Sequence, residues 1–153
     1  NGCHVAEVEV DIETGAPRIV RYTAADDFGH VVNHTVVEGQ LHGGVAQGAG
    51  QVFGEHARYD RDTGQLLAGT FMDYPMPRAD LFGDILAIDH PVPSPSNALG
   101  AKGAGEAGTT GAIPALMSAL LDALRPLGVT HLDMPATPER LWRAIHATDR
   151  RTP

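Results

Sequence analysis

Hydrophobic and acidic residues alternate near the start of the chain, over residues 5–12. Alternation with a period of two is typical of a strand that has one buried and one solvated face. Turn-forming residues follow at 14–17, and residues 18–25 are again rich in strand-forming types, so a β-hairpin is predicted. By the same criteria, further strands are predicted over residues 65–72, 84–90 and 129–133.

Apolar residues recur every three to four positions in three other segments, which are therefore predicted to be amphipathic helices. The first is expected to begin at Thr35, which can form a capping box with Glu38, and to end near Tyr59. The second is expected over residues 111–124. The third is expected over residues 137–145, because a threonine N-cap is followed there by a proline in the first turn.

The first helical segment is unusual because it contains six glycines, at positions 39, 43, 44, 48, 50 and 54. Each glycine costs roughly 0.8–1 kcal/mol relative to alanine in a helix interior. Close approach of another backbone or of a ligand would offset this cost, and a bend or break is expected near residues 48–50. The segment also carries Gln40, Gln47 and Gln51, whose amides both donate and accept hydrogen bonds. A ligand-binding helix and a tightly packed interior helix both fit this pattern.

The elements together predict an α+β fold, with an antiparallel or mixed sheet and packed helices. The length of 153 residues suits one domain, and the net charge of −8 argues against nucleic acid or an anionic membrane as the main partner. A single cysteine excludes an internal disulfide. No apolar run of about 18 residues and no signal-peptide pattern is apparent, so we expect no membrane span and a cytoplasmic location.

Other polar residues give weaker signals. Asp26 and Asp27 are adjacent and are expected to lie in a solvated turn, with a metal or acid–base role as the less favoured alternative. The histidines do not have the spacing of a zinc site, so no metal ligand is predicted among the side chains. Residues 150–153 are expected to form a frayed tail.

The chemistry is concentrated in residues 100–111, which we call the glycine loop. Five glycines there surround Lys102, Glu106, Thr109 and Thr110. Glycines allow backbone N–H groups to approach a ligand closely, and the N-terminus of the following helix would point its positive end at the same place. A carboxylate held there is a candidate base beside an anionic cofactor.

Two nucleotide-binding motifs resemble this loop only partly. Gly103, Gly105 and Gly108 fit the dinucleotide fingerprint, but that motif follows a strand, and the preceding residues 91–97 are rich in proline. A Walker loop is excluded because glycine follows Lys102 where serine or threonine is required. A packed, glycine-rich connection with a solvated Glu106 remains the alternative.

The sequence Gly-Ala-Lys-Gly-Ala-Gly-Glu at 100–106 resembles the loop that bears the catalytic glutamate in the molybdenum hydroxylases. This family contains xanthine dehydrogenase and aerobic carbon monoxide dehydrogenase. The similarity continues, in the expected order, through residues 37–51, 70–79 and 133–142. It implies that residues 1–153 form one domain in the C-terminal part of the large, molybdopterin-binding subunit.

The resemblance implies a role for each matching residue. Glu106 would be the base that takes the proton of a hydroxyl on molybdenum before its oxygen attacks the substrate. The metal would be held by the dithiolene of molybdopterin, in its cytosine dinucleotide form, and not by a protein side chain. The cofactor would be contacted by residues of the first helix and of the glycine loop: Gln47, Gly48, Gly50, Lys102, Gly103, Gly105, Thr109 and Thr110. Lys102 would also favour the ionised form of Glu106.

The resemblance also implies partners. These are the rest of the large subunit, subunits that carry iron–sulfur clusters and FAD, and a small-molecule substrate. The alternative from a different class is a catalytically silent structural or assembly half-domain on the same scaffold, and a nucleotide-binding module is the third possibility.

Overall fold

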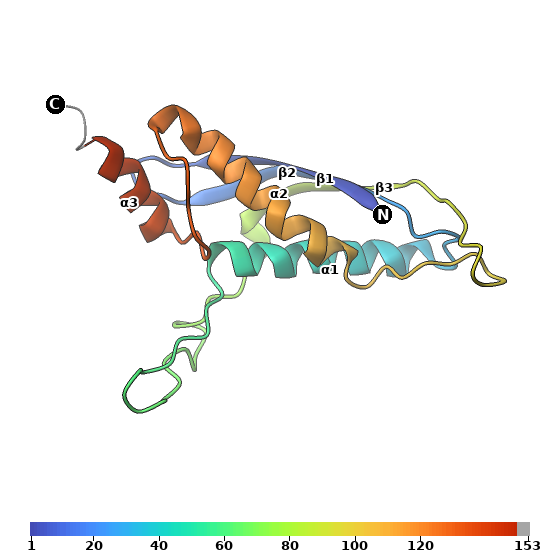
Figure 1. Ribbon diagram of the computed structural model, residues 1–153, viewed down its shortest axis with the longest axis horizontal. Coiled ribbons are helices and arrows are strands. Elements are labelled where there is room, and N and C mark those ends of the chain that lie inside the picture. The colour runs from blue at the N-terminus through green and yellow to red at the C-terminus, as the bar shows by residue number, and fades with distance from the viewer. Residues whose placement is uncertain (150–153) are drawn as a thin grey trace.

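The computed structural model describes residues 1–149 and arranges them as a sheet with helices packed on one face (Figure 1). The sheet contains β1 (Gly2–Val10), β2 (Pro17–Asp26) and β3 (Phe82–Asp89), in the order β1-β2-β3. The first two strands form the predicted antiparallel hairpin, and β3 runs parallel to β2. The sheet is therefore mixed, and the predicted α+β class is confirmed.

Three α-helices complete the fold: α1 (His34–Phe53), α2 (Ala107–Leu124) and α3 (Pro138–Asp149). Two short 3-10 turns, Ala79–Leu81 and Arg125–Leu127, precede β3 and follow α2. The third helix begins as the sequence predicts, because the Thr137 hydroxyl accepts a hydrogen bond from the Arg140 N–H at 3.3 Å. The predicted tail at 150–153 lies outside the described residues.

The core follows the periodicities that the sequence shows. One face of β2 points toward the helices, and Ile19, Tyr22 and Ala24 are buried on it. The step of three positions from Ile19 to Tyr22 coincides with a register shift in the pairing of β2 with β1. The helices contribute buried residues at intervals of three to seven positions, namely Leu41, Val45, Val52, Leu116, Leu120 and Leu124. All of these side chains belong to one apolar cluster, which fixes α1 and α2 relative to the sheet.

Glycines let α1 and α2 approach each other closely. A Cβ atom added to Gly44 would lie 2.8 Å from the Thr109 nitrogen, and one added to Gly48 would lie 2.7 Å from the Ala112 Cβ. Gly108 is equally confined, because its added Cβ would lie 2.8 Å from the Val45 nitrogen. These distances are shorter than van der Waals contact, so a side chain at these positions would push α1 and α2 apart. Of the two kinds of close approach that the glycines suggested, the one to another backbone is present here. The predicted break near residues 48–50 is wrong, since α1 is continuous to Phe53.

The ends of α1 differ from the prediction. The N-cap is Asn33, two residues before Thr35, and its Oδ1 accepts a hydrogen bond from the Val36 N–H at 3.1 Å. Asparagine is a strong N-cap residue, and it takes precedence over the capping box that the sequence suggested. The helix ends at Phe53, not near Tyr59, because the chain turns away after the N–H groups of Gly54 and Glu55 both donate to the Gly50 carbonyl.

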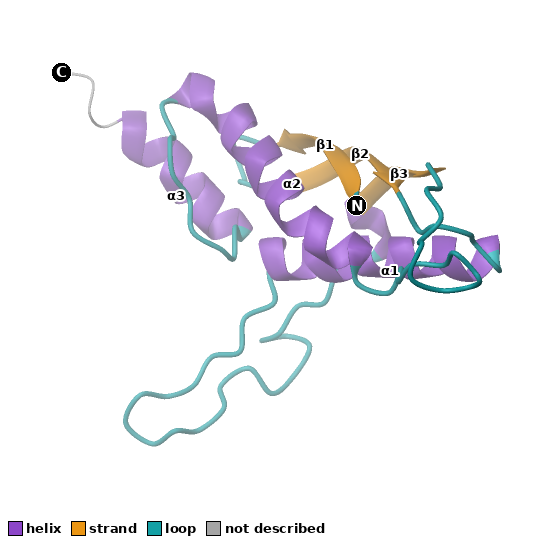
Figure 2. Cartoon of the chain, turned by 45° about the vertical axis from the view of Figure 1, so that its right-hand side comes forward, coloured by secondary structure: helices purple, strands orange, loops and turns teal. Residues whose placement is uncertain are grey.

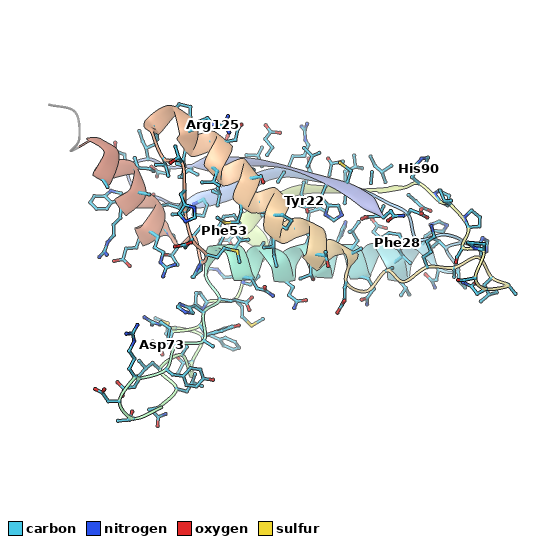
Figure 3. All side chains as sticks on the ribbon, viewed as in Figure 1. Tyr22, Phe28, Phe53, Asp73, His90 and Arg125 are labelled. Carbon is cyan, nitrogen blue, oxygen red and sulfur yellow. The ribbon has the colours of Figure 1, made fainter. Side chains whose placement is uncertain are left out.

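Residues 55–78 form an arm that extends away from the body of the fold, and Asp73 marks its outer part in Figure 3 (Figures 2 and 3). The predicted strand over residues 65–72 is wrong, because the arm offers only an isolated bridge between Tyr59 and Leu66. Because the arm lies away from the sheet, residues 65–72 have no neighbouring strand with which to pair. Phe71 and Met72 are 80% and 91% exposed on this arm.

Two further boundaries need correction. Residues 129–133 form no strand, because the sheet ends at β1 and β3 and neither edge pairs with them. The second helix begins at Ala107, four residues before the predicted start, so Thr109 and Thr110 lie in its first turns. Within residues 1–149, the segment Ala107–Leu127 alone has the length and mean hydropathy (1.2) of a membrane-spanning helix. Here one apolar face of this segment packs on α1 and β1.

Candidate functional site

A groove of about 970 Å³ lies between β1 and α2, and its lining runs along α2 from Ala107 to Asp122. Glu106 is on its rim, at the N-cap of α2, and its side chain is exposed. The other polar side chains of the lining include His4, Asp26, Thr110 and Asp122. Because Glu106 is the N-cap of α2, the positive end of the α2 dipole lies beside Glu106 and favours anionic groups in that part of the groove.

The glycine loop reaches this groove by crossing α1. Its Gly105 lies beside Gln40, since an added Cβ would be 3.8 Å from the Gln40 Oε1. Further on, the Thr109 hydroxyl is 3.1 Å from the Gly44 carbonyl oxygen and 3.2 Å from the Gln47 Oε1. The backbone at position 106 thus lies close to the glutamine-bearing helix, between Gly105, which is near Gln40, and Thr109, which contacts Gln47.

Six of the eight residues predicted to contact the cofactor divide into two groups by exposure. Gln47, Gly103, Gly105 and Thr110 are exposed near Glu106 and are available to a ligand. Gly48 and Gly50 are buried: the first packs against α2, and an added Cβ on the second would lie 2.9 Å from the Pro77 ring. Their packing explains why they are glycines, and their contact with a cofactor stays a prediction.

The backbone donors of the glycine loop are fewer than the sequence suggested. Because α2 begins at Ala107, the Thr110 N–H donates to the Glu106 carbonyl at 3.0 Å and is not available to a ligand. The Ala107 N–H is directed at the Ala104 carbonyl at 3.4 Å. The N–H groups of Gly103 and Gly105, which precede the helix, can face a bound anion.

Lys102 does not lie beside Glu106 as expected. Its ammonium group forms an ion pair with the Asp27 carboxylate, and its backbone N–H donates to the Phe28 carbonyl at 2.9 Å. Among residues 1–149, no ion pair joins Lys102 to Glu106, because the ammonium group pairs with Asp27 instead. The same contact corrects the solvated turn predicted for Asp27, whose side chain is only 10% exposed.

Asp26 is also buried, and it ends a chain of polar groups at the base of the groove. The His4 ring lies between it and Tyr22: Nε2 is 3.0 Å from the Asp26 Oδ2, and Nδ1 is 2.7 Å from the Tyr22 hydroxyl. Burial and the Asp26 charge raise the pKa of the Tyr22 hydroxyl, so it stays protonated and donates to Nδ1. The imidazole can then donate from Nε2 to the carboxylate, which satisfies all three groups. In Figure 3, Tyr22 lies between α2 and the sheet.

Sequence reasoning missed this polar chain. The three residues are separated by up to 22 positions, and no motif connects them. The signal was available only through the hairpin, because pairing β1 with β2 places His4 opposite Ala24, two residues from both Tyr22 and Asp26. The ring also explains Gly111, where any side chain would collide with the imidazole.

Four glycines near the site have open space around them. Nothing lies within 4 Å of a Cβ added to Gly39, Gly43 or Gly103, and Gly105 meets only the Gln40 amide oxygen. Two of these glycines are exposed inside α1, where alanine would be the more stable residue. Packing among residues 1–149 does not account for them, so they leave room for a group beyond the described residues.

Comparisons with known proteins identify the family. Residues 1–82, more than half of the chain, match the model of the molybdopterin cofactor-binding domain. The chain belongs to the molybdenum hydroxylase family. This hydroxylase segment is 39% identical to the carbon monoxide dehydrogenase large chain of Hydrogenophaga pseudoflava, over 94% of its length and 18% of that relative. It is also 39% identical to the nicotine 6-hydroxylase large subunit of Paenarthrobacter nicotinovorans, with the same coverage of both chains.

Solved structures give the same result. Quinoline 2-oxidoreductase from Pseudomonas putida 86 superposes on the hydroxylase segment with a TM-score of 0.90 and 42% identity, over 95% of this chain and 18% of that one. The chain therefore spans about one fifth of the length of the relatives it matches. Among residues 1–149, no three histidine, cysteine, aspartate or glutamate side chains gather as they would to hold a metal ion.

Proposed function

We propose that this chain is the part of a molybdenum-dependent oxidoreductase large subunit that presents Glu106 as the general base beside bound molybdopterin. The observation that carries the proposal is the position of Glu106, which is exposed at the N-cap of α2 over the groove, in a chain of this family. A base must reach the reacting atom, and an exposed side chain at a helix N-terminus can do so.

The residues around Glu106 fit an anionic pterin cofactor. The open space at Gly39, Gly43 and Gly103 can admit a group of the size of a ring system against the backbone. The exposed amide of Gln47 can both donate and accept, as a pterin edge requires, and the N–H groups of Gly103 and Gly105 can donate to phosphate or carbonyl oxygens. The end of the α2 dipole favours negative charge at the same place.

When bound, molybdopterin would supply the metal centre that accepts the electrons of the oxidation. The chain contributes the proton acceptor. An ionised Glu106 carboxylate can take, at one of its Oε atoms, the proton of the hydroxyl group whose oxygen then attacks the substrate. Gly105 directly precedes Glu106, so no side chain competes with this carboxylate from that position. Gln47 and the α2 N-terminus would orient the cofactor and would not take part in proton transfer.

The proposal extends to the whole enzyme. The cofactor would be the cytosine dinucleotide form of molybdopterin, and electrons would leave through partner subunits with iron–sulfur clusters and FAD, in the cytoplasm. Two relatives are named as the large chain or large subunit of their enzymes, and this supports a multi-subunit assembly. The oxidised substrate would be a small molecule, whose pocket residues lie largely outside this segment.

Glu106→Gln in the complete enzyme tests the proposal, since glutamine keeps the shape and cannot accept the proton. We expect kcat to fall by about 10²- to 10⁴-fold, while the molybdenum and pterin contents stay unchanged. The matched control is Glu13→Gln, in the exposed β1–β2 turn, which should leave both unchanged. Wild-type turnover in the Glu106→Gln enzyme would refute the catalytic role and favour the silent scaffold.

A further inference from the structure

The glycine loop is attached to the fold on both sides of Glu106. On the later side, α2 is fixed against α1, because Gly108 packs directly on the α1 backbone. On the earlier side, residues 100–102 form a short antiparallel ladder with residues 28–30, in which the His30 N–H donates to the Gly100 carbonyl and the Lys102 N–H to the Phe28 carbonyl, both at 2.9 Å. Residues 103–106 connect these two anchors.

Asp27 holds the earlier anchor together. Its Oδ1 accepts hydrogen bonds from the backbone N–H groups of Gly29 and Val92, each at 2.9 Å, and its Oδ2 pairs with the Lys102 ammonium. One carboxylate therefore joins the turn after β2, the loop after β3 and the glycine loop. The Lys102 ammonium and the two N–H donors lower the pKa of this carboxyl, so it is ionised and the pair is charged at neutral pH.

The intervening segment cannot fix itself. Gly103 and Gly105 have wide conformational freedom and open space around them. Within residues 1–149, the Glu106 side chain makes no capping hydrogen bond to its own helix. On the later side, the Thr110 N–H donates to the Glu106 carbonyl at 3.0 Å, so α2 holds the backbone of Glu106. The earlier anchor sets the path of residues 103–105, which lead into it.

We propose that Asp27 is a positioning residue for Glu106: through its ion pair with Lys102, it fixes the start of the glycine loop and so determines where the catalytic carboxylate is presented. This inference rests on the proposed function of Glu106. It also assigns Lys102 to the support of the loop and not to direct contact with the cofactor. A misplacement of about 1 Å in a reacting group can cost about 10²-fold in rate, so a modest loosening of the anchor is measurable.

Asp27→Asn in the complete enzyme is the central test. Asparagine keeps an oxygen for the N–H groups of Gly29 and Val92 and removes only the charge that holds Lys102. We expect kcat per bound molybdenum to fall about 10- to 100-fold, with KM for the substrate changed by less than about threefold and with unchanged molybdenum content. Amide hydrogen exchange should become faster over residues 100–106 and stay unchanged in the sheet.

Lys102 supplies an independent measurement. Lys102→Met, which keeps the apolar stem, should reduce kcat as much as Asp27→Asn does, and the double variant should be no worse than either single variant, because both remove the same interaction. Lys102→Arg keeps the charge and should restore most of the activity. The control is Asp11→Asn, an aspartate that accepts a hydrogen bond from the Glu13 N–H in the β1–β2 turn, at the other end of the sheet; it should change neither kcat nor exchange of the glycine loop.

The outcomes separate this inference from the proposed function. If Glu106→Gln is inactive while Asp27→Asn turns over at the wild-type rate, the positioning role is refuted and the base stands. If the two single losses multiply in the double variant, the residues act separately and the inference also fails. Activity in the Glu106→Gln enzyme would overturn both proposals together. A loss of molybdenum in Lys102→Met with normal retention in Asp27→Asn would return Lys102 to the cofactor and refute its assignment to the anchor.

Discussion

Gly108→Ala should separate α1 from α2 and destabilise the base of the site. The added Cβ would collide with the Leu41 carbonyl oxygen and would lie 2.8 Å from the Val45 nitrogen and 3.0 Å from the Gly44 carbonyl carbon. These are backbone atoms of a continuous helix, so no side chain can rotate to make room. Overpacking of this kind costs about 1–3 kcal/mol, and a clash with backbone atoms that cannot move aside lies at the upper end of this range, at about 3 kcal/mol. The gain in helix propensity returns up to about 1 kcal/mol, so we expect a net loss of about 2 kcal/mol.

Hydrogen exchange measured by mass spectrometry on the complete large subunit can test this loss locally. A loss of about 2 kcal/mol corresponds to roughly 30-fold faster exchange in peptides from α1 and α2. Gly69→Ala on the arm is the control, because nothing lies within 4 Å of the added Cβ atom there and the residue is exposed. Exchange in peptides from α1 and α2 should stay unchanged in this variant. Wild-type or slower exchange in Gly108→Ala would refute the argument that the glycines serve close helix packing.

Two further predictions concern the polar groups near the groove. Tyr22→Phe removes the hydroxyl that donates to the His4 Nδ1 and leaves a buried nitrogen unpaired, so β1 should lose about 1–3 kcal/mol of local stability. Amide hydrogen exchange of β1 measures this loss, and Tyr74→Phe on the arm is the control. Because the pKa of Asp27 is lowered, its ion pair should contribute fully above the ordinary aspartate range near ~3.9 and be lost as pH falls through the depressed value. Exchange of residues 100–102, corrected for intrinsic pH dependence, should therefore stay slow from neutral pH to below ~3.9, and an earlier loss would contradict the assignment.

The sequence predicts those parts of the fold in which local pattern and tertiary context agree. The hairpin, β3 and the third helix have clear periodicity or strong caps, and they form close to the expected places. The strand predicted over residues 65–72 has good strand-forming composition, but the segment lies on the arm and has no neighbour to complete a ladder. Pairing partners are a property of the whole chain, and composition does not reveal them.

The candidate site shows the same division. A motif of consecutive residues pointed to Glu106 and its glycines as candidate site residues. Spacing along the chain is enough to recognise such a motif, because all of its members lie on one loop. The roles of Lys102 and Asp27 could not be predicted, since their contact joins residues 75 positions apart. The sequence offered Glu106 as the nearest acidic neighbour of Lys102, whereas the parallel pairing of β2 with β3 brings Asp27 to it instead.

The reach of the Asp27 carboxylate has a consequence for the order of folding. Its bonds to Val92 and Lys102 close loops of 65 and 75 residues, and such closures are entropically costly until other contacts have brought the ends together. Only the docking of β3 beside β2 does this, because it places residues 89 and 26 opposite each other. The segment that carries Glu106 therefore takes its final shape after the sheet is assembled. A full-length chain whose folding stopped before that stage would contain the glutamate but would not have formed the site around it.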